Sequence, residues 1–161
     1  MTDDTRTKAV YVAPGSEEAL WFFGMLVLVK VSAEQSGGQF NLTEQLGRRG
    51  TATPIHRQPG DDETFHVLEG ELEFYLGEQQ TILARAGATA YIPAGQPHAF
   101  VVVSETARWL NLTTANHEAF FRAAGSPAER RELPPPMPPD MDKVMAAAAT
   151  YGVEILGPPP V

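Results

Sequence analysis

The chain has 161 residues, a length typical of one domain and too short for two hydrophobic cores joined by a linker. Its net charge of −8, from 12 Lys and Arg against 20 Asp and Glu, disfavours binding to nucleic-acid phosphates. Cysteine is absent, which excludes disulfides and thiolate chemistry. The longest apolar stretch, residues 19–29, is far shorter than the ~20 residues that span a bilayer. With no signal peptide visible, we expect a cytoplasmic protein without a membrane partner.

Residues 1–19 are polar and are predicted to form an N-terminal extension. Residues 20–115 contain short apolar runs separated by Gly- and Pro-rich turns. Within these runs the apolar residues either alternate with polar ones or are continuous, and they lack the helical period of 3.6. Seven or more strands at this spacing, without intervening helices, predict an all-β sandwich or barrel. The predicted strands are residues 25–31, 40–45, 65–68, 71–76, 89–92, 99–103 and 108–113.

Residues 116–161 are predicted to form a helical and proline-rich tail. Asn116 is a candidate N-cap for a helix that ends near Ala124, and Asp140 is a candidate cap for a second helix over residues 141–151. Five prolines within residues 133–140 indicate an extended spacer before the second helix. An apolar stripe in the second helix, from Met141 to Ala148, favours core or dimer packing.

The densest group of potential ligands lies in residues 56–63. His56 and Gln58 are two residues apart and would share one face of a strand. If residues 59–62 form a hairpin loop, Gln58 opposes Glu63, and His56 opposes Phe65. An imidazole, an amide oxygen and a carboxylate would then converge, which suits a divalent metal. A second turn, over residues 93–97, leads into His98.

Together these segments resemble the two motifs of the cupin family. The first motif falls on Gly50, His56, Gln58, Glu63 and Gly70, and the second falls on Gly87, Pro93, Gly95 and His98. The resemblance implies a cupin double-stranded β-helix, a jelly-roll barrel, here with C-terminal helices. It also implies a metal held inside the barrel. Flanking residues 36–40, 53–56 and 61–70, with the tail, are similar to the quercetin 2,3-dioxygenase-like branch.

One position departs from the family pattern, because Gln58 stands where the family has a histidine. Either His56, Glu63 and His98 form a two-histidine, one-carboxylate triad with Gln58 as a weak fourth ligand or outer group, or the site no longer binds metal tightly. We favour one bound divalent transition metal, which could be Fe, Ni, Mn, Co, Cu or Zn.

The resemblance favours a metal-dependent dioxygenase that acts on an aromatic or polyketide-like small molecule, with Glu63 as ligand and catalytic proton acceptor. The alternatives are a non-oxidative cyclase, isomerase or lyase, and a non-catalytic binding cupin. Family resemblance also implies a homodimer. His66 is expected on the outer face of its strand, and His117 is expected to carry no chemistry. Aromatic residues that could line a substrate pocket are Phe40, Phe65, Tyr91, Phe100 and Trp109.

Overall fold

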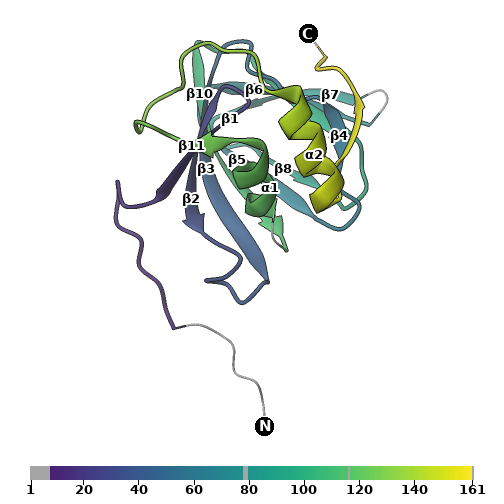
Figure 1. Cartoon of the computed structure of the whole chain (residues 1–161). Coiled ribbons are helices and arrows are strands. Elements are labelled where there is room, and N and C mark those ends of the chain that lie inside the picture. Colours follow the sequence, from purple (N-terminus) through teal and green to yellow (C-terminus); the bar gives the residue numbers. More distant parts are fainter. Residues whose placement is uncertain (1–7, 78–79, 116, 161) are drawn as a thin grey trace.

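The computed structural model describes residues 8–77, 80–115 and 117–160, which form two antiparallel β-sheets that face each other (Figure 1). The seven-stranded sheet runs in the order β11 (Ser126–Pro127), β1 (Glu18–Phe22), β2 (Met25–Val31), β3 (Phe40–Arg48), β10 (Thr106–Thr114), β5 (Glu63–Glu69) and β8 (Thr89–Ile92). The five-stranded sheet runs in the order β12 (Glu154–Gly157), β4 (Ile55–Arg57), β9 (His98–Val102), β6 (Glu71–Leu76) and β7 (Gln80–Arg85). The chain is therefore an all-β jelly roll, as the sequence predicts.

Alternation of burial along strands such as β3, β5 and β10 shows how the sequence builds this sandwich. In β10 every second residue from Ala107 to Thr113 is buried, while the intervening side chains are half-buried or exposed. Because successive strand residues point to opposite faces, one face of each strand fills the space between the sheets. Most of that space is apolar and is centred on Trp109, Phe74 and Leu72, all of which have negligible exposure.

Two helices lie side by side against the barrel in Figure 1, α1 (His117–Ala124) and α2 (Met141–Tyr151). Both helices were predicted, and the Asp140 carboxylate caps α2 by accepting a hydrogen bond from the Lys143 amide at 3.1 Å. The predicted cap Asn116 lies outside the described residues. Val144 of the predicted stripe is buried, whereas Met145 is 50% exposed. Ala148 is also buried but Met141 is 41% exposed, so only half of the stripe packs inward, and the homodimer stays a prediction.

Residues after position 115 do more than follow the barrel, because they add strands to both sheets. Strand β11 pairs with β1, and β12 pairs with β4. The sequence did not indicate these short strands, nor β1 and β7, whereas the strand expected at His56 corresponds to β4. In β7 only Ala84 is buried, so the strand lacks the alternation by which a half-buried strand is recognised.

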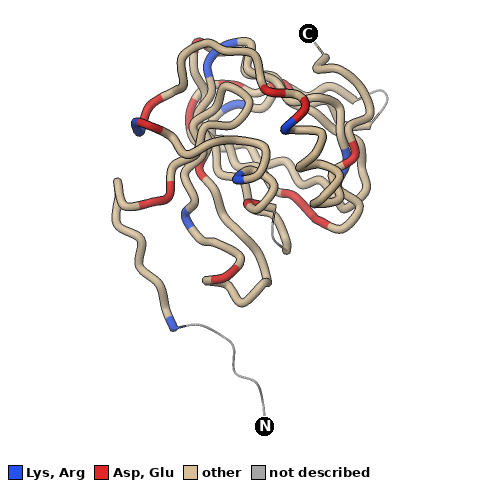
Figure 2. The backbone as a smooth tube through the Cα atoms, viewed as in Figure 1, with Lys and Arg blue, Asp and Glu red and all other residues tan. Residues whose placement is uncertain are grey.

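Acidic and basic residues are interspersed along the chain (Figure 2). On the outer face of the seven-stranded sheet, Lys30 pairs with Glu17 and Glu44, and Arg108 pairs with Glu44 and Glu69. These pairs tie neighbouring strands together at their surface. Among the described residues, no helix has the length and apolar character needed to span a membrane.

Candidate metal site

The loop that precedes Glu63 carries the chain from one sheet to the other. The predicted hairpin is wrong, because β4 pairs with β9 and β12, whereas β5 pairs with β8 and β10. Gln58 therefore does not oppose Glu63, and His56 opposes His98 rather than Phe65. The loop is held by other partners, since the Gln58 carbonyl accepts a hydrogen bond from the Gly95 amide at 2.9 Å. The ligand candidates meet across the barrel interior instead of across a hairpin.

His56, Glu63 and His98 nevertheless converge. Each offers one ligand atom, and these three atoms lie within 4.8 Å of one another. The two imidazole rings are 4.3 Å apart between centroids, and His98 Nε2 lies 2.8 Å from Glu63 Oε2. Two imidazoles and one carboxylate form a donor set suited to divalent transition metals.

Backbone carbonyls orient both histidines. The Nδ1 atom of His56 lies 2.8 Å from the Pro54 carbonyl oxygen, and that of His98 lies 3.0 Å from the Gln96 carbonyl oxygen. A carbonyl only accepts hydrogen bonds, so each Nδ1 carries a proton and each Nε2 is directed to the site. The same arrangement fixes the tautomer of metal-binding histidines in other proteins.

Both oxygens of Glu63 are engaged inside the barrel. Asn111 Nδ2 donates a hydrogen bond to Oε1 at 2.8 Å, and His98 bonds to Oε2. Burial by itself raises the pKa of Glu63, but the hydrogen bond and charge of His98, aided by His117 and His56, bring this pKa to about 2. Burial likewise opposes the charge on His98, yet bonding to Glu63 raises the pKa of His98 above its ordinary value. Without metal, the two side chains form a buried ion pair.

The remaining groups at the site are disfavoured as cations. Loss of solvent around the ring, together with the charge of His98, lowers the pKa of His56 to about 4. Burial also lowers the pKa of His117. A neutral imidazole is the form that binds a metal or accepts a hydrogen bond.

Gln58, the residue that replaces the family histidine, is 3% exposed and contacts His117, with 3.2 Å between their Nε2 atoms. Its Oε1 is buried and has no hydrogen-bond partner within the described part of the chain. A buried amide oxygen is costly to leave unpaired, and a cation beside it would satisfy it. This orphaned oxygen and the triad therefore fit a divalent metal.

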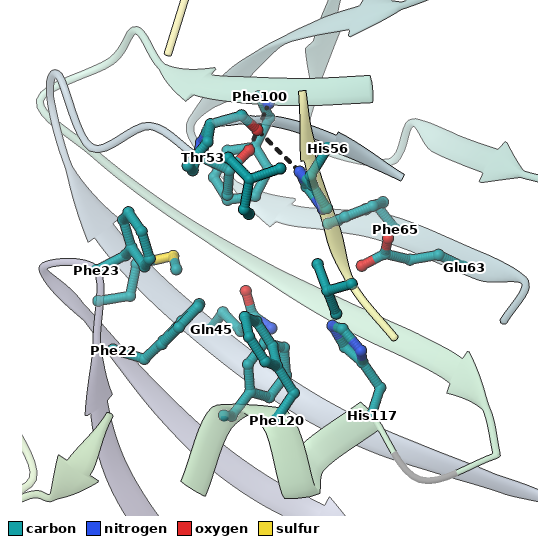
Figure 3. A pocket seen from close by; sticks show the side chains of 15 residues that line it. Phe22, Phe23, Gln45, Thr53, His56, Glu63, Phe65, Phe100, His117 and Phe120 are labelled. Atoms are coloured by element: carbon teal, nitrogen blue, oxygen red, sulfur yellow. Dashed lines mark hydrogen bonds between the residues drawn. The ribbon is translucent and has the colours of Figure 1, made fainter. Parts of the chain in front are cut away.

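Two members of the triad, His56 and Glu63, line a cavity between the sheets and α1 (Figure 3). His56 and Glu63 project from one side and His117 rises from α1 on the other, while Phe22 and Phe23 close the end near the β1–β2 turn. The volume of this cavity that can hold the centre of a water molecule is about 30 Å³. By that measure one water needs ~10–15 Å³, so the cavity has room for about two. An aromatic ring could enter only if the phenylalanine side chains moved.

Of the five aromatic residues expected to line a substrate pocket, two line this cavity. Phe65 and Phe100 line the cavity. Tyr91 is 60% exposed on the outer side of β8, and Phe40 lies on the face of β3 opposite to the buried Asn41. Trp109 is fully buried but lies behind Phe100, with its ring nitrogen bonded to Gln45 Oε1. Composition alone did not show which face of each strand points inward.

His117 is the first residue of α1 and lines the cavity, a position that the sequence analysis did not indicate. A signal was present in the sequence: His117, Phe120, Phe121 and Ala124 have helical i, i+3, i+4 and i+7 spacing, and all four are buried. Gln45 also lines the cavity. It could not be predicted from sequence, because the residues of β3 that point inward, Asn41, Thr43 and Gln45, are polar. His66 lies outside, bonded to Thr89, as predicted.

The comparisons with known proteins agree with this architecture. Residues 46–113 match the family model for the cupin domain. Quercetin 2,3-dioxygenase from Bacillus subtilis is 30% identical over 132 residues, which are 81% of this chain and 39% of that relative. The chain thus spans well under half the length of this relative. With the fold and both motifs in place, the chain belongs to the cupin superfamily.

Solved structures support the fold at lower sequence identity. KdgF from a Halomonas species aligns with a TM-score of 0.61 and 14% identity, covering 68% of this chain and 96% of that one. The polyketide cyclase RemF from Streptomyces resistomycificus aligns with a TM-score of 0.58 and 22% identity, covering 80% and 83% respectively. At these identities the likeness concerns the barrel and not the reaction.

Proposed function

We propose that this cupin is a metal-dependent dioxygenase that acts on an aromatic or polyketide-like small molecule. The observation that carries the proposal is the convergence of His56, Glu63 and His98, two of which, His56 and Glu63, line an aromatic-rich cavity. Sequence similarity to a quercetin 2,3-dioxygenase supports the oxidative class. A divalent transition metal at this point would polarise a hydroxyl–ketone edge of the substrate and permit its reaction with O2.

The protein's own residues would perform three tasks. Phe65 and Phe100 would contact the substrate ring, because both line the cavity beside the triad. Glu63, ionised at neutral pH and aimed into the cavity, would accept the substrate hydroxyl proton at one carboxylate oxygen. The tightly packed phenylalanines would close over the bound ring and exclude bulk water.

Oxygen consumption tests this proposal directly. Protein stripped of metal is reloaded in turn with Fe²⁺, Ni²⁺, Mn²⁺, Co²⁺, Cu²⁺ and Zn²⁺ and mixed with quercetin and other flavonols in an oxygen-electrode cell. We expect uptake with at least one metal and none with His56→Ala, which removes one ligand. If the wild-type protein binds each metal yet consumes no O2, the dioxygenase proposal is wrong.

A non-oxidative reaction is the second candidate, favoured by the buried His98–Glu63 pair. A protonated imidazole bonded to a carboxylate can move a proton to or from a substrate without redox chemistry, as in cyclisation or isomerisation. Glutamine in place of a histidine ligand is compatible with this role, since no redox tuning is required. Mass spectrometry separates the candidates, because a product of unchanged mass excludes incorporation of O2.

A further inference from the structure

His117 reaches Gln58 from outside the segment that matches the cupin family model, which ends at residue 113. Both side chains are buried, and their Nε2 atoms are 3.2 Å apart. An amide nitrogen can donate a hydrogen bond but cannot accept one. This contact therefore requires that His117 Nε2 is unprotonated and accepts a hydrogen bond from the amide of Gln58.

The surroundings of His117 favour that tautomer. Its Nδ1 faces the carboxylate of Asp61, with Oδ2 at 4.0 Å, so the negative charge favours a proton on Nδ1. Phe120 and Phe121 pack against the imidazole, with ring centroids at 5.4 and 4.7 Å. The ring is thus held in place with its Nε2 lone pair presented to Gln58.

Tethering the amide nitrogen also fixes the amide oxygen. The nitrogen and oxygen of the glutamine amide belong to one planar group and point in different directions. When the nitrogen is held by His117, the direction of the oxygen is fixed as well. Gln58 Oε1 is the atom without a hydrogen-bond partner among the residues described. Gln58 lies two residues after His56, just beyond the end of β4 at Arg57, and its amide contacts His117, which lines the same cavity as His56 and Glu63.

We propose that Gln58 binds the metal through Oε1 as a fourth ligand, and that His117 is the positioning residue that holds the amide in the orientation required. The inference rests on the metal site proposed above and adds a residue from α1 to it. His117 would do for Gln58 what backbone carbonyls do for His56 and His98, namely fix which atom faces the metal. A histidine at position 58 would need no such partner from α1.

Co²⁺ binding tests the proposal without reference to activity. The dissociation constant is measured by chelator competition, and the visible absorption spectrum reports the ligand set, for the wild type, His117→Phe, Gln58→Leu and the double variant. Loss of an outer-shell partner typically weakens metal affinity by about 10–100-fold. We expect a loss of that size for each single variant, no further loss in the double variant, and the same spectral change in all three.

Two further proteins keep the test decisive. His66→Phe makes the same substitution on the outer face of the barrel and should leave Co²⁺ affinity unchanged. In a Gln58→His background, where the new imidazole replaces the amide, His117→Phe should cost no affinity. Circular dichroism of the metal-free variants establishes that each one is folded.

The failures of the two proposals are distinguishable. Wild-type affinity in His117→Phe, or additive losses in the double variant, would show that His117 does not act through Gln58. Wild-type protein that binds no Co²⁺ would instead overturn the metal site itself, and the proposed function with it.

Discussion

Gly70 is the single residue between β5 and β6, where the chain passes from one sheet to the other, and its replacement by alanine should be among the most damaging small substitutions. Its φ of +76° lies in the left-handed region, which costs a residue with a Cβ about 1–2 kcal/mol. The added Cβ would also lie 2.3 Å from the Thr106 carbonyl oxygen and 2.8 Å from Ala107 Cα. Both contacts are with backbone atoms of β10, which cannot rotate away.

The magnitude follows from adding the two effects. Overpacking a well-filled site costs about 1–3 kcal/mol, so Gly70→Ala should lower the free energy of unfolding by about 2–5 kcal/mol once the backbone strain is included. Gly77→Ala is the matched control, because Gly77 has a similar φ of +68° but no atom of the described residues lies within 4 Å of the added Cβ. It should show the strain alone, about 1–2 kcal/mol.

Urea denaturation of the three proteins, followed by tryptophan fluorescence, measures both differences. The denaturant midpoint should fall much further for Gly70→Ala than for Gly77→Ala, with an unchanged slope. Equal losses in the two variants would refute the reasoning, since they would mean that the approach of β10 to this corner contributes nothing.

Three other predictions concern the site and its supports. In metal-free protein, the pKa of His56 is about 4, against 6.5 in the unfolded chain. Protonation therefore favours the unfolded chain, and stability falls as the pH drops from 6.5 towards 4. Between pH 7 and pH 4 the free energy of unfolding, measured by urea titration, should fall by about 3 kcal/mol more for the wild type than for His56→Gln. Phe100→Ala should cost about 3–5 kcal/mol by calorimetry, because its buried ring packs among other aromatic rings, whereas exposed Tyr91→Ala should stay within about 0.5 kcal/mol. Asp140→Ala removes the cap of α2 and should lower stability by about 0.5–2 kcal/mol, with a drop in thermal midpoint and little change in Co²⁺ affinity.

The proposed reaction requires the cavity to widen, because its volume admits small molecules but not an aromatic ring. Phe23 forms the β1–β2 turn together with Gly24 at φ values of 50° and 74°, so a phenylalanine occupies a left-handed position at the cavity wall. Such positions are strained for large side chains and often occur beside ligand sites. Displacement of this turn would widen the cavity at the end opposite to the triad.

The sequence by itself determined the class of fold and the identity of the principal ligand candidates. Short apolar runs bounded by turn residues predicted strands such as β2 and β8 with their observed bounds, and Asp140 marked the start of α2. Motif spacing singled out His56, Glu63 and His98, which do converge. These patterns are local or depend on fixed intervals along the chain, so they can be recognised without knowing which strands pair.

Only the tertiary structure decided how those residues meet and what surrounds them. The segment before Glu63 connects β4 of the five-stranded sheet to β5 of the seven-stranded sheet. The local hairpin does not form, because β4 pairs with β9, a strand distant in sequence. His117 enters the cavity because α1 packs across the open side of the barrel, a contact that no spacing within the motifs encodes. Register and burial are properties of the whole sandwich, since each depends on the free energy of all the packed strands at once.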